Sequence, residues 1–275
     1  MKVLRVFPRK TEMTPADELA FIGDPPMQAF RPQADEVHIC TVFTWDKERA
    51  ERLRYAWQQY YPAVRIGGPA YGTPCDGFTP GFYVRSGTTF TSRGCNNHCP
   101  WCEVPRREGK IREFPIISPG HIIQDNNFLQ CSGSHLEKVF AMLRSQHQVE
   151  FRGLDSQLLT SDIADQIRGL RIRQVFFAAD TPEAIRPLRK ALQILQMPRQ
   201  KVRCYVLLKF NPNETISYAR HRMELVWEAG AMPFAQLYQP TDRWIVYPRE
   251  WRDFARTWSR PAAMKAEMRK YEYSK

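Results

Sequence analysis

The fold of this chain is constrained most by a repeat of short apolar segments between residues 88 and 240. Each segment is rich in β-branched and aromatic residues, and stretches of helical periodicity lie between them. Strands that alternate with helices build a parallel sheet, because a parallel connection needs a long crossover. The sequence therefore predicts an α/β fold, with six strands at 88–92, 121–125, 149–153, 173–180, 202–208 and 231–238.

The segment before this repeat predicts one smaller unit. Residues 37–43 and 63–66 have the composition of strands, and residues 46–60 have the apolar face of a helix, so together they predict a βαβ unit. Five prolines interrupt residues 1–36, so we expect an irregular arm there. The expected division is an arm at 1–36, a βαβ extension with its linker at 37–87, the strand–helix repeat at 88–240 and a helical tail at 241–275.

Composition narrows the class of protein. No run of about 18 apolar residues occurs, which excludes a membrane-spanning helix. The N-terminus lacks the apolar core of a secretory signal, and seven cysteines cannot all form disulfides within the chain, so we expect a cytoplasmic protein. The 40 lysines and arginines against 29 aspartates and glutamates give a net charge of +11, which favours an anionic partner such as nucleic acid.

Three cysteines stand close together in the loop that follows the first strand of the repeat. Cys95, Cys99 and Cys102 have the spacing C-x3-C-x2-C. A structural zinc normally has four protein ligands, and His98 is too close to Cys99 to share a metal with it. A zinc-containing nucleic-acid-binding module without catalysis would need a distant fourth ligand such as His121. A [4Fe-4S] cluster, whose usual protein ligands are thiolates, is the other candidate for this site.

The C-x3-C-x2-C triplet, with Trp101 just before its last cysteine, resembles the signature of radical S-adenosylmethionine (radical SAM) enzymes. The resemblance implies a partial (β/α)6 TIM-like barrel over residues 88–240. It also implies that the three cysteines bind a [4Fe-4S] cluster whose open iron is chelated by the amino and carboxylate groups of SAM. In this family an external electron donor, similar to flavodoxin or ferredoxin, reduces the cluster. SAM is then cleaved to a 5′-deoxyadenosyl radical, which abstracts hydrogen from a substrate that the sequence does not identify.

The same resemblance implies positions for SAM at the carboxyl ends of the strands, where ligands of parallel barrels bind. The family places an aromatic near the adenine or cluster, oxygen acceptors for the methionine amino group after the second strand, and polar groups for ribose and carboxylate after the next two. The corresponding residues here are Trp101, then Asp125, Asn126 and Asn127, and finally Arg152, Asp155 and Asp180. Asp125–Asn127 could also be a simple turn, and Asp180 a helix cap. No catalytic residue beyond the cluster is assigned.

Residues 37–72 resemble the tail of the cobalamin-binding-type domain that precedes the barrel in some radical SAM proteins. A single βαβ unit is smaller than such a domain, and no D-x-H-x-x-G run is present to bring a histidine to cobalt. We therefore expect no cobalamin. Within the radical SAM hypothesis, the basic charge favours a nucleic-acid or nucleotide substrate over a peptide.

Overall fold

The computed structural model describes residues 1–72 and 78–273; part of the expected linker, 73–77, and the last two residues lie outside the described residues. The chain divides into two compact units. We call them the N-terminal unit, Met1–Thr88 with Pro240–Trp244, and the C-terminal unit, Thr89–Gln239 with Ile245–Lys275. Among the described residues, no helix is both long and apolar enough to cross a membrane.

The N-terminal unit is a four-stranded parallel sheet with one α-helix, α1 (Lys47–Gln58). Its strand order is β2-β1-β3-β4, formed by β1 (Val3–Phe7), β2 (Ala20–Ile22), β3 (Glu36–Cys40) and β4 (Val64–Gly67). The prediction of an irregular arm at 1–36 was therefore wrong, because β1 is an interior strand that is buried along its whole length. The prolines of this region lie outside the strands, so they do not prevent the pairing.

Helix α1 covers one face of this sheet and completes its core. Leu53 and Trp57 are fully buried against strand residues such as Leu4, and the Trp57 indole donates a hydrogen bond to the carbonyl of Gly23 at 3.0 Å. Both side chains therefore stabilise the N-terminal unit itself. The unit is larger than the single βαβ motif that the sequence suggested.

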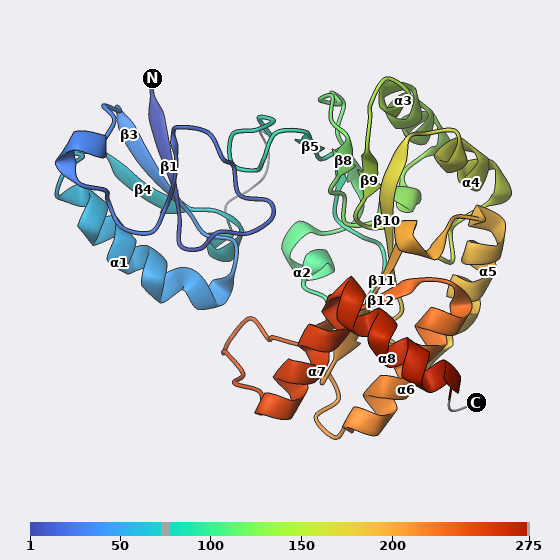
Figure 1. Ribbon diagram of the computed structural model, residues 1–275. Helices are drawn as coiled ribbons and strands as arrows, with labels where there is room; N and C mark the ends of the chain where they lie inside the picture. Colours follow the sequence, from blue (N-terminus) through green and yellow to red (C-terminus); the bar gives the residue numbers. More distant parts are fainter. Residues whose placement is uncertain (73–77, 274–275) are drawn as a thin grey trace. The chain divides into compact units, whose positions relative to one another are not determined.

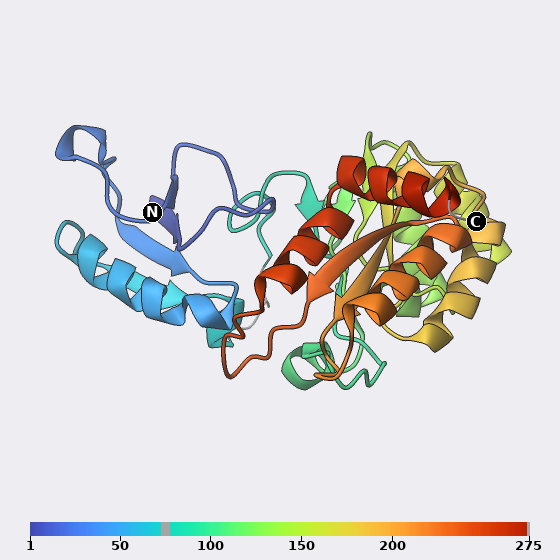
Figure 2. The same ribbon diagram turned by 60° about the horizontal axis from the view of Figure 1, so that its bottom comes forward.

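The C-terminal unit contains a six-stranded sheet in which the strands are ordered as they occur in the sequence (Figures 1 and 2). The strands are β5 (Thr88–Thr89), β8 (Ile122–Ile123), β9 (Val149–Phe151), β10 (Ile172–Ala178), β11 (Val202–Leu208) and β12 (Met232–Leu237). The pairs from β8 to β12 are parallel, so the α/β class with a parallel sheet is confirmed.

The first strand is shorter than predicted. Residues 88–92 divide into β5 and β6 (Ser92–Arg93), and β6 pairs in the antiparallel direction with β7 (Arg112–Glu113). The backbone N–H of Thr91, between the two strands, donates to the Asp125 carboxylate at 2.7 Å. This bond takes the chain out of the parallel ladder and starts the loop that carries the cysteines.

Helices cover one face of the six-stranded sheet (Figures 1 and 2). They are α3 (Gly133–Leu143), α4 (Ser161–Arg168), α5 (Ile185–Leu195) and α6 (Ile216–Ala229), followed by α7 (Arg249–Ser259) and α8 (Pro261–Tyr273). Ser132 caps α3, because its hydroxyl accepts from the N–H of His135. Thr160 and Thr215 cap α4 and α6 in the same way.

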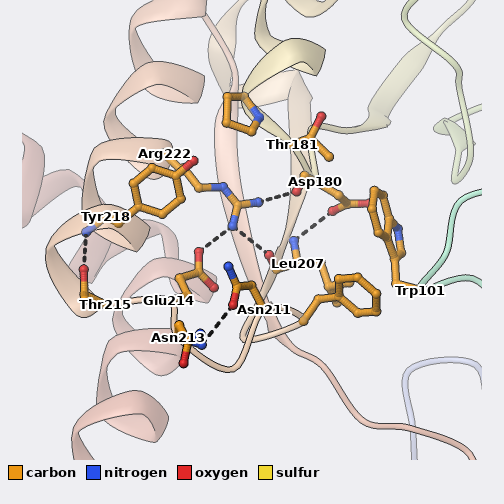
Figure 3. A pocket seen from close by; sticks show the side chains of 12 residues that line it. Trp101, Asp180, Thr181, Leu207, Asn211, Asn213, Glu214, Thr215, Tyr218 and Arg222 are labelled. Atoms are coloured by element: carbon orange, nitrogen blue, oxygen red, sulfur yellow. Dashed lines mark hydrogen bonds and ion pairs between the residues drawn. The ribbon is translucent and has the colours of Figure 1, made fainter.

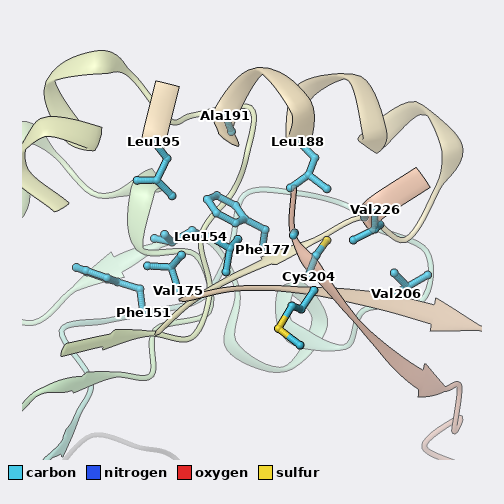
Figure 4. Close-up of a cluster of buried hydrophobic side chains, with 14 of the residues drawn as sticks. Phe151, Leu154, Val175, Phe177, Leu188, Ala191, Leu195, Cys204, Val206 and Val226 are labelled. Atoms are coloured by element: carbon cyan, nitrogen blue, oxygen red, sulfur yellow. The ribbon is translucent and has the colours of Figure 1, made fainter. Parts of the chain in front are cut away.

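The core between sheet and helices consists of large apolar side chains from both layers (Figure 4). Val175, Phe177 and Val206 from the strands meet Leu188 of α5 and Val226 of α6, and all five are almost completely buried. Burial of each such side chain stabilises a fold by about 1.5–3 kcal/mol. This packing fixes the strands and therefore the loops at their carboxyl ends.

The remaining elements are short and lie mostly in connections. They are α2 (Val104–Glu108) and the 3-10 turns η1 (Gln28–Phe30), η2 (Thr44–Asp46), η3 (Pro69–Tyr71), η4 (Phe128–Gln130), η5 (Pro182–Ala184) and η6 (Arg199–Lys201). The first crossover of the six-stranded sheet, between β5 and β8, contains the β6–β7 pair and, as its helix, the short α2.

Candidate functional site

The three cysteines lie on a loop, residues 94–111, that is closed at its base by the β6–β7 pair; we call it the cysteine loop. The N–H of Cys95 donates to the carbonyl of Gly109 at 3.1 Å, which draws the two limbs together. Gly94 has a φ of +87°, and a Cβ there would lie 2.1 Å from the carbonyl oxygen of Lys110. Only glycine fits such an approach, so the base of the loop is built around Gly94.

Amide side chains from the loop and from the end of β8 hold the cysteine loop in shape. Asn126 accepts from the N–H of Gly94 at 3.0 Å, and Gln130 accepts from the N–H of Asn96 at 2.7 Å. Gln130 also donates to the side chain of Asn97 at 2.9 Å. Sequence reasoning missed the roles of Asn96, Asn97 and Gln130, although the two asparagines inside the cysteine motif were the available signal.

The three thiols are close enough to influence one another. Burial raises the pKa of Cys99, and the neighbouring Cys102 and Cys95 raise it further. Burial also raises the pKa of Cys102, although a hydrogen bond from the backbone of Val104 opposes the shift. Thiols in this setting need a strongly positive partner, such as a metal centre, to be held as thiolates.

No group of three histidine, cysteine, aspartate or glutamate side chains surrounds a single-ion position within residues 1–72 and 78–273. A tetrahedral zinc needs its sulfurs to converge on one point, whereas each thiolate of a cubane binds a different iron. His98 is exposed. His121 precedes β8, at the opposite end of the strand from the cysteine loop, and its carbonyl accepts from the N–H of Glu150 at 2.7 Å.

The structure gives Asp125 a different role from the one suggested by the resemblance. Its carboxylate is buried, and it accepts from the N–H and hydroxyl of Thr91 at 2.7 and 2.5 Å and from the hydroxyl of Ser92 at 2.8 Å. Burial raises the pKa of Asp125, while these hydrogen bonds oppose the shift. Its oxygens are occupied, so Asp125 positions the start of the cysteine loop and is not available to a ligand.

Asn127 lies beside the first cysteine with one polar atom to spare. Its Nδ2 is 3.8 Å from Cys95 Sγ and donates to Asp155 Oδ2 at 3.2 Å. The side chain is 5% exposed, yet its Oδ1 has no hydrogen-bond partner among the described residues. Buried polar atoms are rarely left unpaired, and a carbonyl oxygen is a suitable acceptor for an ammonium group. Asp155 also accepts from Asn97 at 2.9 Å, so it tethers both asparagines.

A cavity of about 310 Å³ adjoins the cysteine loop at Trp101 (Figure 3). Its lining comes from the ends of β10 and β11, from the start of α6 and from Trp101. Asp180 Oδ1 accepts from the N–H of Leu207 at 2.8 Å. Burial raises the pKa of Asp180, while the N–H of Leu207, the Arg222 guanidinium and the neighbouring Trp101 indole oppose the shift. The Trp101 ring meets that of Phe210 with centroids 5.4 Å apart.

A buried ion pair supports the opposite wall of this cavity (Figure 3). Arg222 bonds to Glu214 at 2.6 Å and donates to the backbone carbonyls of Leu207 and Asp180 at 3.0 and 2.7 Å. Glu214 also accepts from the N–H of Lys209, which has a φ of +62°. Sequence reasoning missed Glu214 and Arg222, because they are eight residues apart and only folding places them together.

Arg152 is engaged away from the cavity wall. It forms an ion pair with Glu150, and its guanidinium lies 4.5 Å from the centroid of Phe176. Of the SAM-site residues expected from sequence, the structure thus gathers Asn126, Asn127 and Asp155 at the cysteine loop, and Trp101 and Asp180 at the cavity.

Comparison with known proteins adds no identity. The sequence matches no family model and no curated protein. Among solved structures, a mutant of phosphofructokinase-2 from Escherichia coli aligns with 90% of this chain and 80% of its own, at 10% identity and a TM-score of 0.27. Similarity at this level supports no conclusion about fold or function.

Proposed function

We propose that this protein is a radical SAM enzyme in which Cys95, Cys99 and Cys102 bind a [4Fe-4S] cluster. The observation that carries the proposal is the pairing of three mutually interacting thiols with the unpaired Oδ1 of Asn127 beside Cys95. The sequential order of the six strands supports the further proposal that they form the family's partial (β/α)6 barrel. The reaction would then occur at the carboxyl ends of the strands, with an external electron donor.

The residues of this chain fit SAM in a specific way. When bound, the cluster supplies one electron, which breaks the C5′–S bond of SAM and yields methionine and the 5′-deoxyadenosyl radical. Asn127 Oδ1 accepts from the methionine ammonium, and this places the sulfonium near Cys95. The cavity beside Trp101 receives the adenosine, whose position is fixed by a wall that Asp180 and the Glu214–Arg222 pair hold rigid.

The cavity lining also protects the reaction from water. Leu207 and Trp101 present apolar surface to the adenosine. Such a lining limits the access of water and of dissolved oxygen, and oxygen would trap a carbon radical or oxidise the cluster. No donor set for a second cofactor is proposed. His38, the histidine of the N-terminal sheet, already uses Nδ1 with Tyr83 at 2.6 Å and Nε2 with Glu36 at 2.8 Å, so we continue to expect no cobalamin.

The proposal is tested by anaerobic purification and reconstitution. We expect about four irons and four sulfides per chain, a reduced-state EPR signal that SAM perturbs, and slow formation of 5′-deoxyadenosine. Changing all three loop cysteines to alanine should abolish iron binding but keep the far-UV circular dichroism of the folded protein. Cys131→Ala, at a buried cysteine outside the loop, is the matched control and should keep its iron. A colourless protein with stoichiometric zinc would refute the cluster.

The SAM contact has a separate test. Asn127→Ala should weaken SAM binding by about 10- to 100-fold, because a hydrogen bond to a charged group contributes about 1.5–3 kcal/mol. Asp125→Asn, which changes a neighbour whose side chain faces Thr91 and Ser92, should leave SAM affinity nearly unchanged. If Asp125→Asn weakened SAM binding more than Asn127→Ala, the contact to the ammonium group would belong to Asp125.

A further inference from the structure

Nearly all the excess positive charge lies in the C-terminal unit. This unit has 28 lysines and arginines against 18 aspartates and glutamates, whereas the N-terminal unit has 12 against 11. A surface made basic only for solubility would distribute the excess over both units. The partition therefore indicates an anionic partner for the unit that carries the cysteine loop.

Part of this charge follows the cysteine triad directly, on the return limb of the cysteine loop and at the start of β7. Four exposed side chains, which we call the rim cations, are Arg106, Arg107, Lys110 and Arg112. The carboxylates of this stretch are held by partners in the fold: Glu108 by Arg93, and Glu113 by the N–H and hydroxyl of Ser132. Glu103 pairs with Arg106. The four cations of this stretch outnumber its three carboxylates.

Helix α7 carries a second row of positive charge. Its arginines recur at helical spacing on the exposed face, at Arg249, Arg252 and Arg256, and the exposed Arg260 follows at the C-cap. Asp253 pairs with the first and third of them, so it offsets only part of the charge. The opposite face of the helix is buried in the core through Trp251, Phe254 and Trp258. The packing of α7 therefore holds the arginine row in place.

A chain of aromatic contacts begins at the cavity and lies between segments that precede the two basic segments in sequence. Trp101 contacts Phe210, and Phe210 contacts Tyr238, with centroids 5.4 and 5.1 Å apart. Helix α2 begins three residues after Trp101. Helix α7 begins two residues after Tyr247, whose hydroxyl donates to the carbonyl of Tyr238 at 2.6 Å. Phe210 and Tyr218, both in the cavity lining, are 36% and 46% exposed.

We propose that a single-stranded nucleic acid binds across this surface, with phosphates on the rim cations and the α7 arginines and an unpaired base against Phe210 and Tyr218. Exposed rings between basic segments suit unpaired bases. Every base has a face that can stack on an aromatic ring, and in a duplex this face is already covered by the neighbouring bases. A free nucleotide carries too few phosphates to use two separate rows of cations. Binding of the strand does not depend on the proposed function. Only the step that makes this strand the substrate of the radical chemistry rests on it.

The proposal is tested by fluorescence anisotropy of the full chain with a labelled oligoribonucleotide of mixed sequence and about 20 nucleotides, titrated between about 50 and 200 mM salt. The quadruple variant Arg106→Gln, Arg107→Gln, Lys110→Gln, Arg112→Gln should bind at least about tenfold more weakly. Its log–log salt slope should be shallower by roughly 2–3, because each phosphate contact on a single strand contributes about 0.7. Tyr218→Ala should weaken binding by about tenfold through lost stacking, with little change in slope.

The matched control removes the same charge from another place. Arg186→Gln, Arg189→Gln and Lys190→Gln neutralise exposed cations of α5, which covers the sheet (Figure 1), and Lys201→Gln neutralises one of η6, at the end of β11 that is remote from the cavity. This variant should lose about twofold or less. Equal losses in both quadruple variants, equal affinity for a duplex of the same length, or no binding by the unmodified chain would each overturn the proposal. Iron content and SAM cleavage, measured on the same preparations, report separately on the cluster.

Discussion

Replacement of Asp125 tests how the cysteine loop is held in place. The carboxylate is 4% exposed and accepts three hydrogen bonds, two from Thr91 and one from Ser92. Asp125→Ala removes all three and leaves the backbone N–H of Thr91 buried without its acceptor. The Thr91 hydroxyl has a second partner, since it lies 3.2 Å from Nε2 of His135. The backbone N–H of Thr91 therefore loses the most, and the destabilisation falls on the start of the cysteine loop.

The expected magnitude follows from these contacts. A hydrogen bond to a charged group contributes about 1.5–3 kcal/mol, and a buried unpaired donor costs about 1–3 kcal/mol. Removing the desolvated charge offsets part of this loss. We expect Asp125→Ala to lower the free energy of unfolding by about 3 kcal/mol. Asp125→Asn should cost only about 1 kcal/mol, because its carbonyl can accept from the Thr91 N–H while its amide donates to the two hydroxyls, which then reverse their roles.

The stability of Asp125→Asn relative to the unmodified chain should also depend on pH, in a definite direction. Burial raises the pKa of Asp125 above its ordinary value of 3.8. A raised pKa contributes stability that is fully present below about pH 3.8 and is lost as the pH rises through the folded-state pKa. The asparagine does not titrate. The advantage of the unmodified chain over Asp125→Asn should therefore be larger at about pH 4 than at pH 7.

Urea unfolding followed by far-UV circular dichroism, at about pH 4 and pH 7, measures these differences. If the stability advantage of the unmodified chain over Asp125→Asn grows toward pH 7, the hydrogen bonds from Thr91 and Ser92 outweigh burial and lower the pKa of Asp125. Equal costs for the alanine and asparagine substitutions would contradict the proposed exchange of donor and acceptor roles.

Three further outcomes test other parts of the fold. Arg222→Leu should cost about 3–5 kcal/mol of stability and Glu214→Gln less, because removal of Arg222 leaves a buried carboxylate uncompensated. Thermal unfolding measures both costs, and a cost near zero would show that the pair is solvated. Gly153→Ala, whose Cβ would meet a backbone oxygen at 2.7 Å, should reduce iron retention after reconstitution, whereas Gly133→Ala, with open space, should be neutral or slightly stabilising. After incubation with hydroxocobalamin and desalting, no corrin should remain; stoichiometric corrin would show that His38 exchanges its present partners for cobalt.

The sequence alone determined the alternation of strands and helices in the C-terminal unit, because burial of a strand or of one helix face imposes a local apolar period. The bounds of β11 were predicted to the residue. Local patterns were weaker where prolines dominated: the arm at 1–36 contains a buried strand, Val3–Phe7, that only its pairing with two neighbours reveals. The cysteines were also visible, because their chemistry and spacing are local properties.

Only the tertiary structure decided what surrounds those cysteines. Asp125 and Asn127 are two residues apart and both were candidates for a ligand, but packing turns one carboxylate toward Thr91 and leaves the other side chain with an unpaired oxygen beside Cys95. Glu214 and Arg222 become a cavity wall because β10, β11 and α6 pack together. Hydrogen-bond partners distant in sequence depend on three-dimensional distance and burial, which no local pattern records.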